Sequence, residues 1–202
     1  MNIKKYKVKI KVDGLLLAGL PEDQEALKFV AKESQSAEEE FKIKMEKAKE
    51  AGEKEVSLEE VRNKNIFRRE NGIPCIDEHH IKGLFREIGR KTKENQKGIM
   101  RGKWKDIHTD PYMIFVQGEE VEEVRAFKTG FPNYASVVCI HEAVKGAEIE
   151  FILEDHGTEM AIEKYIEYLS YGGRYIGLGA ARGKSGLNGS YGLFTLLSFE
   201  VG

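Results

Sequence analysis

The sequence predicts an α+β fold in which an antiparallel sheet carries helices on one face. Residues 6–12 alternate apolar side chains with lysines, which is the period-two pattern of a half-buried strand. Two segments, 77–88 and 158–171, space their apolar residues along one face of a helix. Further strand-like runs lie between and after these helices, and no internal repeat is visible.

The composition excludes several classes of protein. Of the 202 residues, 41% are hydrophobic and 33% are charged, a balance typical of soluble globular chains rather than disordered ones. No run approaches the roughly 18 apolar residues of a membrane-spanning helix. The N-terminus lacks the apolar core of a signal peptide, so we expect a cytoplasmic protein. Cys75 and Cys139 lie in strand-like runs without a CxxC partner, which favours buried free thiols over a disulfide. We predict neither a metal nor a cofactor.

A charged segment, residues 21–65, follows the first strand. Its pattern is helical, and Ser36 and Ser57 each open a capping-box sequence that places a helix start at the next residue. Apolar residues are few in this segment, so its helices could cover little core. We interpret it as a helical insertion in a single domain that spans residues 1–202.

The first predicted core helix has a clear start and two distinct faces. Asn71-Gly72 between two apolar runs predicts a hairpin just before it. Asp77 then stands where an N-cap belongs, ahead of an apolar stripe at helical spacing. The opposite face carries bases, namely Lys82, Arg86, Arg90 and Lys93.

The second half of the chain completes the predicted fold. Residues 93–111 have the polar, basic pattern of a loop and hold the only tryptophan, Trp104. The segments expected after it are strands at 112–116, 121–127, 135–141 and 147–153, a helix at 159–171 capped by Thr158, and a strand at 191–201. Without the insertion, the order β-α-β-β-α-β is the ferredoxin-like (RRM-like) arrangement.

Charge is distributed unevenly along the chain. The net charge is −2, whereas nucleic-acid binders are often basic overall. The acids concentrate in the insertion, and bases predominate from Arg68 to Lys105. A glycine-rich segment, 172–192, contains bases and no acid. The totals therefore conceal a basic face that suits phosphate groups.

The glycine-rich segment 172–192 contains eight glycines. At this density backbone N–H groups can approach a ligand closely and form an anion-binding nest. Gly183-Lys184-Ser185 matches half of a P-loop, but Leu178 stands where the template needs glycine, and only a terminal strand follows. We therefore reject a nucleotide site. The alternative, that these glycines only serve a tight bulge or a flexible loop, stays open.

Two distant segments match one known pattern together. Ile73-Pro74 is followed by Ile81-Lys82-Gly83-Leu84-Phe85-Arg86, and the second segment is Gly177-Leu-Gly-Ala-Ala-Arg-Gly-Lys-Ser-Gly186. Both resemble the RAMP superfamily of CRISPR-associated RNA-binding proteins, in its Ile-Pro and Leu-Lys-Gly-x-apolar-Arg motif and in its C-terminal glycine-rich signature. Residues 75–80 replace the family's usual Gly-Ser-Ser turn. The resemblance covers most of the chain outside 21–65.

The resemblance implies a guide-RNA-binding subunit of a CRISPR-type ribonucleoprotein in antiviral defence. Its partners would be single-stranded RNA and other subunits, or further copies along the RNA, with no membrane. The insertion 21–65 could serve as a thumb or lid, and its acidity suits protein contact better than RNA contact. The residues expected to bind RNA are Lys82, Arg86, Arg90, Trp104, Arg174, Gly177, Gly179, Arg182 and Lys184. Trp104 between two lysines is expected to stack on a base, unless it only anchors its loop to the core.

Catalysis is not the favoured expectation, but it has candidates. A metal-independent ribonuclease needs a general base and a general acid, and His79 or His80 could supply either. Adjacent helical residues point about 100° apart, which favours a surface or capping role for this pair. Asp106 in the basic loop is a third candidate. Two alternative functions therefore stay open: a repeat-processing endoribonuclease, and a RAMP-fold protein-binding module such as a viral mimic of a CRISPR subunit.

Overall fold

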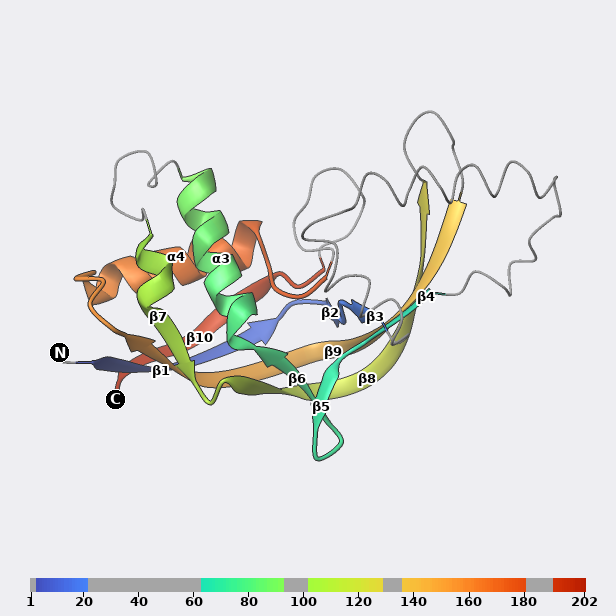
Figure 1. Ribbon diagram of the computed structural model, residues 1–202, viewed down its shortest axis with the longest axis horizontal. Helices are drawn as coiled ribbons and strands as arrows, with labels where there is room; N and C mark the ends of the chain where they lie inside the picture. Colours follow the sequence, from blue (N-terminus) through green and yellow to red (C-terminus); the bar gives the residue numbers. More distant parts are fainter. Residues whose placement is uncertain (1–2, 22–62, 93–101, 129–135, 181–190) are drawn as a thin grey trace, which may run out of the picture. The chain divides into compact units, whose positions relative to one another are not determined.

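A computed structural model describes residues 3–21, 63–92, 102–128, 136–180 and 191–202 (Figure 1). The chain falls into two compact units. The first unit takes residues 1–18, 67–121 and 142–202, and the second takes residues 19–66 and 122–141. The helix starts expected after Ser36 and Ser57 lie outside the described residues.

The first unit is a mostly antiparallel sheet with two helices on one face (Figure 1). This confirms the predicted α+β class. The strand order is β10-β1-β9-β8-β6-β5, and β2 and β7 pair with β9. The strands are β1 (Lys4–Val12), β2 (Leu15–Leu17), β5 (Arg68–Glu70), β6 (Ile73–Asp77), β7 (Ile107–Asp110), β8 (Met113–Lys128), β9 (Ser136–Asp155) and β10 (Phe194–Val201). The helices are α3 (Glu78–Lys91) and α4 (Ile162–Tyr175).

The predicted start of the first core helix is confirmed in detail. Asn71 and Gly72 both have positive φ, as the turn of a tight β5–β6 hairpin requires. The Asp77 carboxylate then accepts a hydrogen bond from the His79 backbone N–H and caps α3. The apolar stripe of α3 is fully buried against the sheet and α4, and it consists of Ile81, Leu84, Phe85 and Ile88.

Three predicted boundaries are wrong in the sheet. The four strands expected between 112 and 153 are two long ones, β8 and β9. Gly118 lies inside β8 and does not end it. A Cβ at this position would lie 2.6 Å from the Val144 side chain of β9, so glycine allows the two strands to approach closely. Residues 107–110 form β7 rather than a loop, since they pair with β9 and bury Ile107 and Thr109.

The expected N-cap of the second helix is also wrong. The helix begins at Ile162, and the Thr158 hydroxyl instead contacts the Tyr165 hydroxyl and accepts from the Met160 N–H. Gly172 and Gly173, taken above as the start of a loop, belong to α4. A Cβ at Gly172 would lie 2.9 Å from the Leu84 and Ile88 side chains, so glycine lets α3 and α4 pack closely.

The second unit joins β3 (Leu20–Pro21) and β4 (Asn63–Ile66) to the outer part of β9. β4 runs parallel to β9, so residues 63–65 are a strand and not the end of a helical insertion. The Asn65 amide nitrogen lies 3.3 Å from Nδ1 of buried His141.

Cys75 in β6 is a buried free thiol, as predicted, and the side chain of Cys139 lies outside those described.

The close contact at Gly173 generates a stability prediction. A Cβ there would overlap the Phe194 carbonyl of β10. Gly173→Ala should therefore lower the free energy of unfolding by about 2–4 kcal/mol, although alanine in a helix is otherwise favoured by about 1 kcal/mol. Urea denaturation measures the difference. Ser170→Ala, on the exposed side of α4, is the control and should change stability by less than about 0.5 kcal/mol.

Candidate functional site

Bases and the only tryptophan meet on the exposed side of α3. Trp104 and Lys105 belong to a short 3₁₀-helix, η1 (Lys103–Asp106), that packs against α3. The Arg86 guanidinium carbon lies 5.8 Å from the centre of the Trp104 ring, and the Lys105 ammonium lies 5.9 Å from it. We call Lys82, Arg86, Trp104 and Lys105 the cationic-aromatic surface.

Trp104 has the anchoring role that was one of the two left open for it, and its stacking on a base stays a prediction. The ring packs against the hydrophobic core and is only partly buried. Arg86 and Lys105 are exposed, and both lie within cation–π distance of the ring. The indole therefore anchors η1 to the core and still presents part of its surface among cations.

Two hydrogen bonds hold η1 to the turn that follows β9. The Lys103 ammonium donates to the Thr158 carbonyl at 2.7 Å, and the His156 N–H donates to the Asp106 carbonyl at 2.9 Å. This turn is itself closed by the Asp155 carboxylate, which accepts from the N–H groups of Gly157 and Thr158. The residues on either side of Trp104–Lys105, Lys103 and Asp106, are thus both bonded to this turn.

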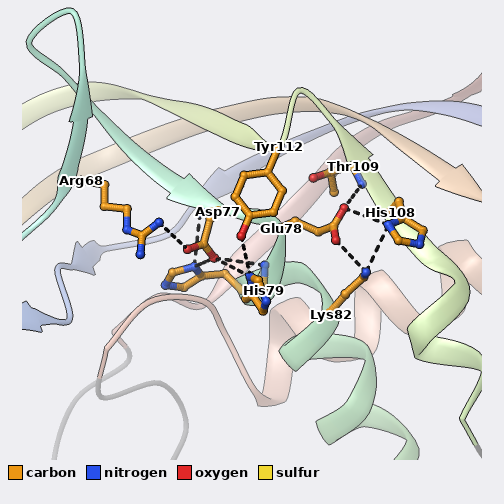
Figure 2. Close-up of polar contacts among 9 residues, drawn as sticks. Arg68, Asp77, Glu78, His79, Lys82, His108, Thr109 and Tyr112 are labelled. Atoms are coloured by element: carbon orange, nitrogen blue, oxygen red, sulfur yellow. Dashed lines mark hydrogen bonds and ion pairs between the residues drawn. The ribbon is translucent and has the colours of Figure 1, made fainter. Parts of the chain in front are cut away.

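Glu78, in the first turn of α3, is the centre of a polar cluster (Figure 2). One carboxylate oxygen accepts from Lys82 at 2.6 Å, and the other accepts from the Thr109 N–H at 3.0 Å and lies 3.2 Å from Nδ1 of His108. Burial raises the pKa of Glu78, but the hydrogen bonds from Lys82 and Thr109 outweigh it, so the pKa lies below its ordinary value. The carboxylate stays ionised and ties α3 to β7.

The cluster continues through a second histidine. The rings of His108 and His156 have their centres 4.6 Å apart. Nε2 of His156 lies 3.0 Å from the Glu154 carboxylate, and Glu154 forms a 2.7 Å ion pair with Lys5 of β1. Two imidazoles from β7 and from the turn after β9 therefore lie side by side, each held by its own carboxylate.

A second acid–histidine group surrounds the N-cap of α3 (Figure 2). Nδ1 of His80 lies 3.0 Å from the Asp77 carboxylate, and it completes a capping box through its contact with the Asp77 backbone N–H at 3.4 Å. The hydrogen bond to His80, with help from the charge of Arg68, holds the pKa of Asp77 below its ordinary value in spite of burial. His79 points outward, and its Nδ1 lies 2.8 Å from the Tyr112 hydroxyl. Thus His80 caps the helix, while His79 is exposed.

The other predicted site residues are dispersed. Arg90 pairs with Glu87 of its own helix, and exposed Arg174 lies over the ring of Tyr175 at 5.8 Å. Asp106 is exposed at the end of η1. Arg182 and Lys184 lie outside the described residues, so their part in RNA binding stays a prediction.

Gly177 and Gly179 have a structural reason for being glycine. Both have positive φ, and a Cβ at Gly179 would lie 2.7 Å from the Leu17 carbonyl. The N–H groups of Gly177, Leu178 and Ala180 all donate to backbone carbonyls of the protein. These three donors are therefore not available to a phosphate, whatever the remainder of the glycine-rich segment does.

The sheet face away from the helices carries lysines that are already paired. Lys5, Lys7 and Lys9 of β1 form ion pairs of 2.7–3.0 Å with glutamates on β9, which lie directly across from Lys5 and diagonally from Lys7 and Lys9. These partners are Glu154, Glu150 and Glu148. The face that β1 and β9 present is consequently close to neutral, in contrast to the cationic-aromatic surface.

No family model and no curated protein sequence matches this chain. Within the described ranges, no group of histidine, cysteine, aspartate or glutamate side chains is arranged to hold a metal ion. Helices long and apolar enough to cross a membrane are absent from that same part of the chain.

Sequence reasoning missed His108 and His156 as a pair. They are 48 residues apart, and only the pairing of β7 with the end of β9 brings them together. The available signal was the alternation of Ile107 and Thr109, which are buried, with His108 and Asp110, which are not. This alternation marks a strand whose two faces differ in burial.

The contacts of Glu78 generate a pH-dependent prediction. Glu78→Gln should lower the free energy of unfolding at pH 7 by about 2–3 kcal/mol, because it leaves the mostly buried Lys82 without its anion. A carboxyl whose folded pKa is lowered stabilises the protein above its unfolded pKa, and this stability is lost as the pH falls through the folded pKa. The gap between wild type and variant should thus narrow below about pH 4.

Urea denaturation at several pH values measures this gap. Glu87→Gln is the matched control, since Glu87 pairs with exposed Arg90 on the same helix and should contribute less than about 0.5 kcal/mol. A gap for Glu78→Gln that stays constant down to pH 3 would contradict the assignment.

Proposed function

We propose that this protein binds single-stranded RNA on the cationic-aromatic surface, as a RAMP-like subunit of a CRISPR-type ribonucleoprotein in the cytoplasm. The observation that carries the proposal is the placement of Arg86 and Lys105 within 6 Å of the Trp104 ring. Arginine and lysine attract the phosphate chain, and an aromatic ring stacks on bases without regard to sequence. A base-stacking ring next to phosphate-binding cations is what single-stranded RNA requires.

The strand order supports a ferredoxin-like (RRM-like) core for this function. Neighbours β10-β1-β9-β8 correspond to the order 4-1-3-2, with α3 between β1 and β8 in sequence and α4 between β9 and β10. β5 and β6 then extend the sheet beyond β8. The described parts of the two motifs of the resemblance, residues 73–86 and 177–180, belong to the same unit.

Charge favours the helical side over the open sheet face as the RNA surface. Neither Arg86 nor Lys105 has a carboxylate partner among the described residues, whereas the β1 lysines are paired with glutamates. A cation already paired in the free protein gains little from a phosphate, since the phosphate must displace its carboxylate. The RNA is therefore expected along α3 and η1.

This expectation is tested by removing one charge from each face. Arg86→Gln should weaken binding of a short oligouridylate about 5–10-fold and reduce the salt slope by about 1. Lys7→Gln, the matched control on the open sheet face, should leave both values unchanged. Fluorescence anisotropy at several salt concentrations measures both, and equal effects of the two variants would refute the assigned surface.

The glycine-rich segment is tested separately. If the segment binds phosphates as the resemblance implies, Arg182→Ala combined with Lys184→Ala should weaken RNA binding. The slope of log affinity against log salt concentration should then decrease by about 2, because two phosphate contacts are lost. An unchanged salt slope would remove this segment from the RNA surface and leave the surface on α3 and η1 standing.

A second candidate function, metal-independent RNA cleavage, is favoured by one observation. His79 is exposed, and the Tyr112 hydroxyl holds its Nδ1 at 2.8 Å, which leaves Nε2 directed away from that contact. An imidazole oriented in this way is a competent general acid or base. Cleavage of RNA in the presence of EDTA by wild type, and its loss in His79→Ala, would support this candidate. Intact RNA after incubation with wild-type protein would eliminate it.

A further inference from the structure

The imidazoles of His108 and His156 lie side by side, and each contacts a carboxylate through one nitrogen only. Each has one nitrogen directed at a carboxylate, with Nδ1 of His108 at Glu78 and Nε2 of His156 at Glu154. The second nitrogen of each ring has no hydrogen-bond partner among the described residues. Both side chains are partly exposed, at 38% and 33%.

The neighbours of each ring bear on which nitrogen carries the first proton. A carboxylate accepts hydrogen bonds, so neutral His156 keeps its proton on Nε2, beside Glu154, and leaves Nδ1 bare. Nδ1 of His108 lies 3.1 Å from the Lys82 ammonium, which can only donate, and 3.2 Å from Glu78, so in the neutral ring it can accept from Lys82. A second proton adds a positive charge to either ring, and both nitrogens of the ring are then donors.

The two carboxylates that contact the rings are offset by two lysines. Lys82 on α3 and Lys5 on β1 offset Glu78 and Glu154. The other charged groups nearby are Lys103, which donates to the Thr158 carbonyl, Asp106, whose carbonyl accepts from His156, Asp110, which acts on Lys5, and buried Asp155, which closes the turn. These groups leave a small excess of negative charge, and full protonation of both imidazoles adds two positive charges to it.

The pair is continuous with the cationic-aromatic surface. Lys82 contacts His108 and lies one helical turn before Arg86, and η1, which holds Trp104, is bonded through Asp106 to the His156 backbone. An RNA strand that stacks a base on Trp104 would carry a neighbouring phosphate past Arg86, which lies one helical turn from Lys82 and its contact with His108. The next group on this path is the imidazole pair.

We propose that His108 and His156 form a proton-linked phosphate-binding site for the bound RNA strand. In the doubly protonated state, their outward N–H groups donate to the non-bridging oxygens of one phosphate. In the neutral state, both positive charges are lost and the bare Nδ1 of His156 repels the same oxygens, so the site releases the phosphate. This inference rests on the proposed RNA binding, and it adds a dependence of affinity on pH that arginine and lysine alone do not give.

The test is the pH dependence of RNA affinity at constant ionic strength. With a fluorescein-labelled oligouridylate as the probe, the affinity of wild type should fall at least about tenfold between roughly pH 5.5 and pH 8, where imidazoles lose their charge. His108→Gln combined with His156→Gln should reduce this change to less than about threefold, with affinity near pH 8 close to that of wild type. Lys7→Gln should retain the full pH dependence, because it removes a paired charge from the other face.

A second measurement keeps the test independent of variant stability. In wild-type protein, the C2–H resonances of the two rings, assigned with the single variants, should move their titration midpoints to higher pH when the oligouridylate is added. RNA binding with a flat pH profile, or unchanged midpoints, would overturn the phosphate site and leave the RNA-binding proposal intact. No RNA binding at any pH would overturn both.

Discussion

The structure of the helical face depends on the carboxylate of Glu78. This carboxylate lies in the first turn of α3, where the helix dipole favours a negative charge, and it is 10% exposed. It accepts a backbone hydrogen bond from Thr109 and so attaches α3 to β7. It also holds Lys82 and His108, so the position of the polar cluster follows from one ionised group. A buried charge is tolerated here because each of its oxygens has a partner.

Glycines at helix and strand contacts supply the second constraint on this unit. Gly172 allows α4 to approach Leu84 and Ile88 of α3, and Gly173 allows it to approach Phe194 of β10. The glycine-rich segment therefore begins as part of the packed core. Glycine content alone does not distinguish close packing from ligand binding, since both need the space that a Cβ would occupy.

Local patterns predicted local structure well. Asn71-Gly72, the Asp77 cap and the apolar stripe of α3 were all predictable, because hairpin turns and helix starts are determined by residues within a few positions of one another. The boundaries of β8 and β9 were not, since the close approach that requires Gly118 involves Val144 on another strand. The same reason explains the candidate site. Arg86 and Trp104 could each be named from the sequence as candidate site residues, but the proximity of His108 and His156 depends on strand pairing between distant segments.

The two faces of the sheet differ in how their charges can respond to a ligand. On β1 and β9 the antiparallel register places Lys7 opposite Ile152 and diagonal to Glu150, and the long side chains close into ion pairs at the surface. Such pairs contribute little to stability, but they cancel the field that would attract a polyanion. Beside η1 the Glu78 carboxylate is instead engaged below the surface, with Lys82 and with the Thr109 N–H, and the exposed anion of η1 is Asp106. The cations exposed next to the Trp104 ring, Arg86 and Lys105, favour contact with a phosphate, and the ring favours contact with a base.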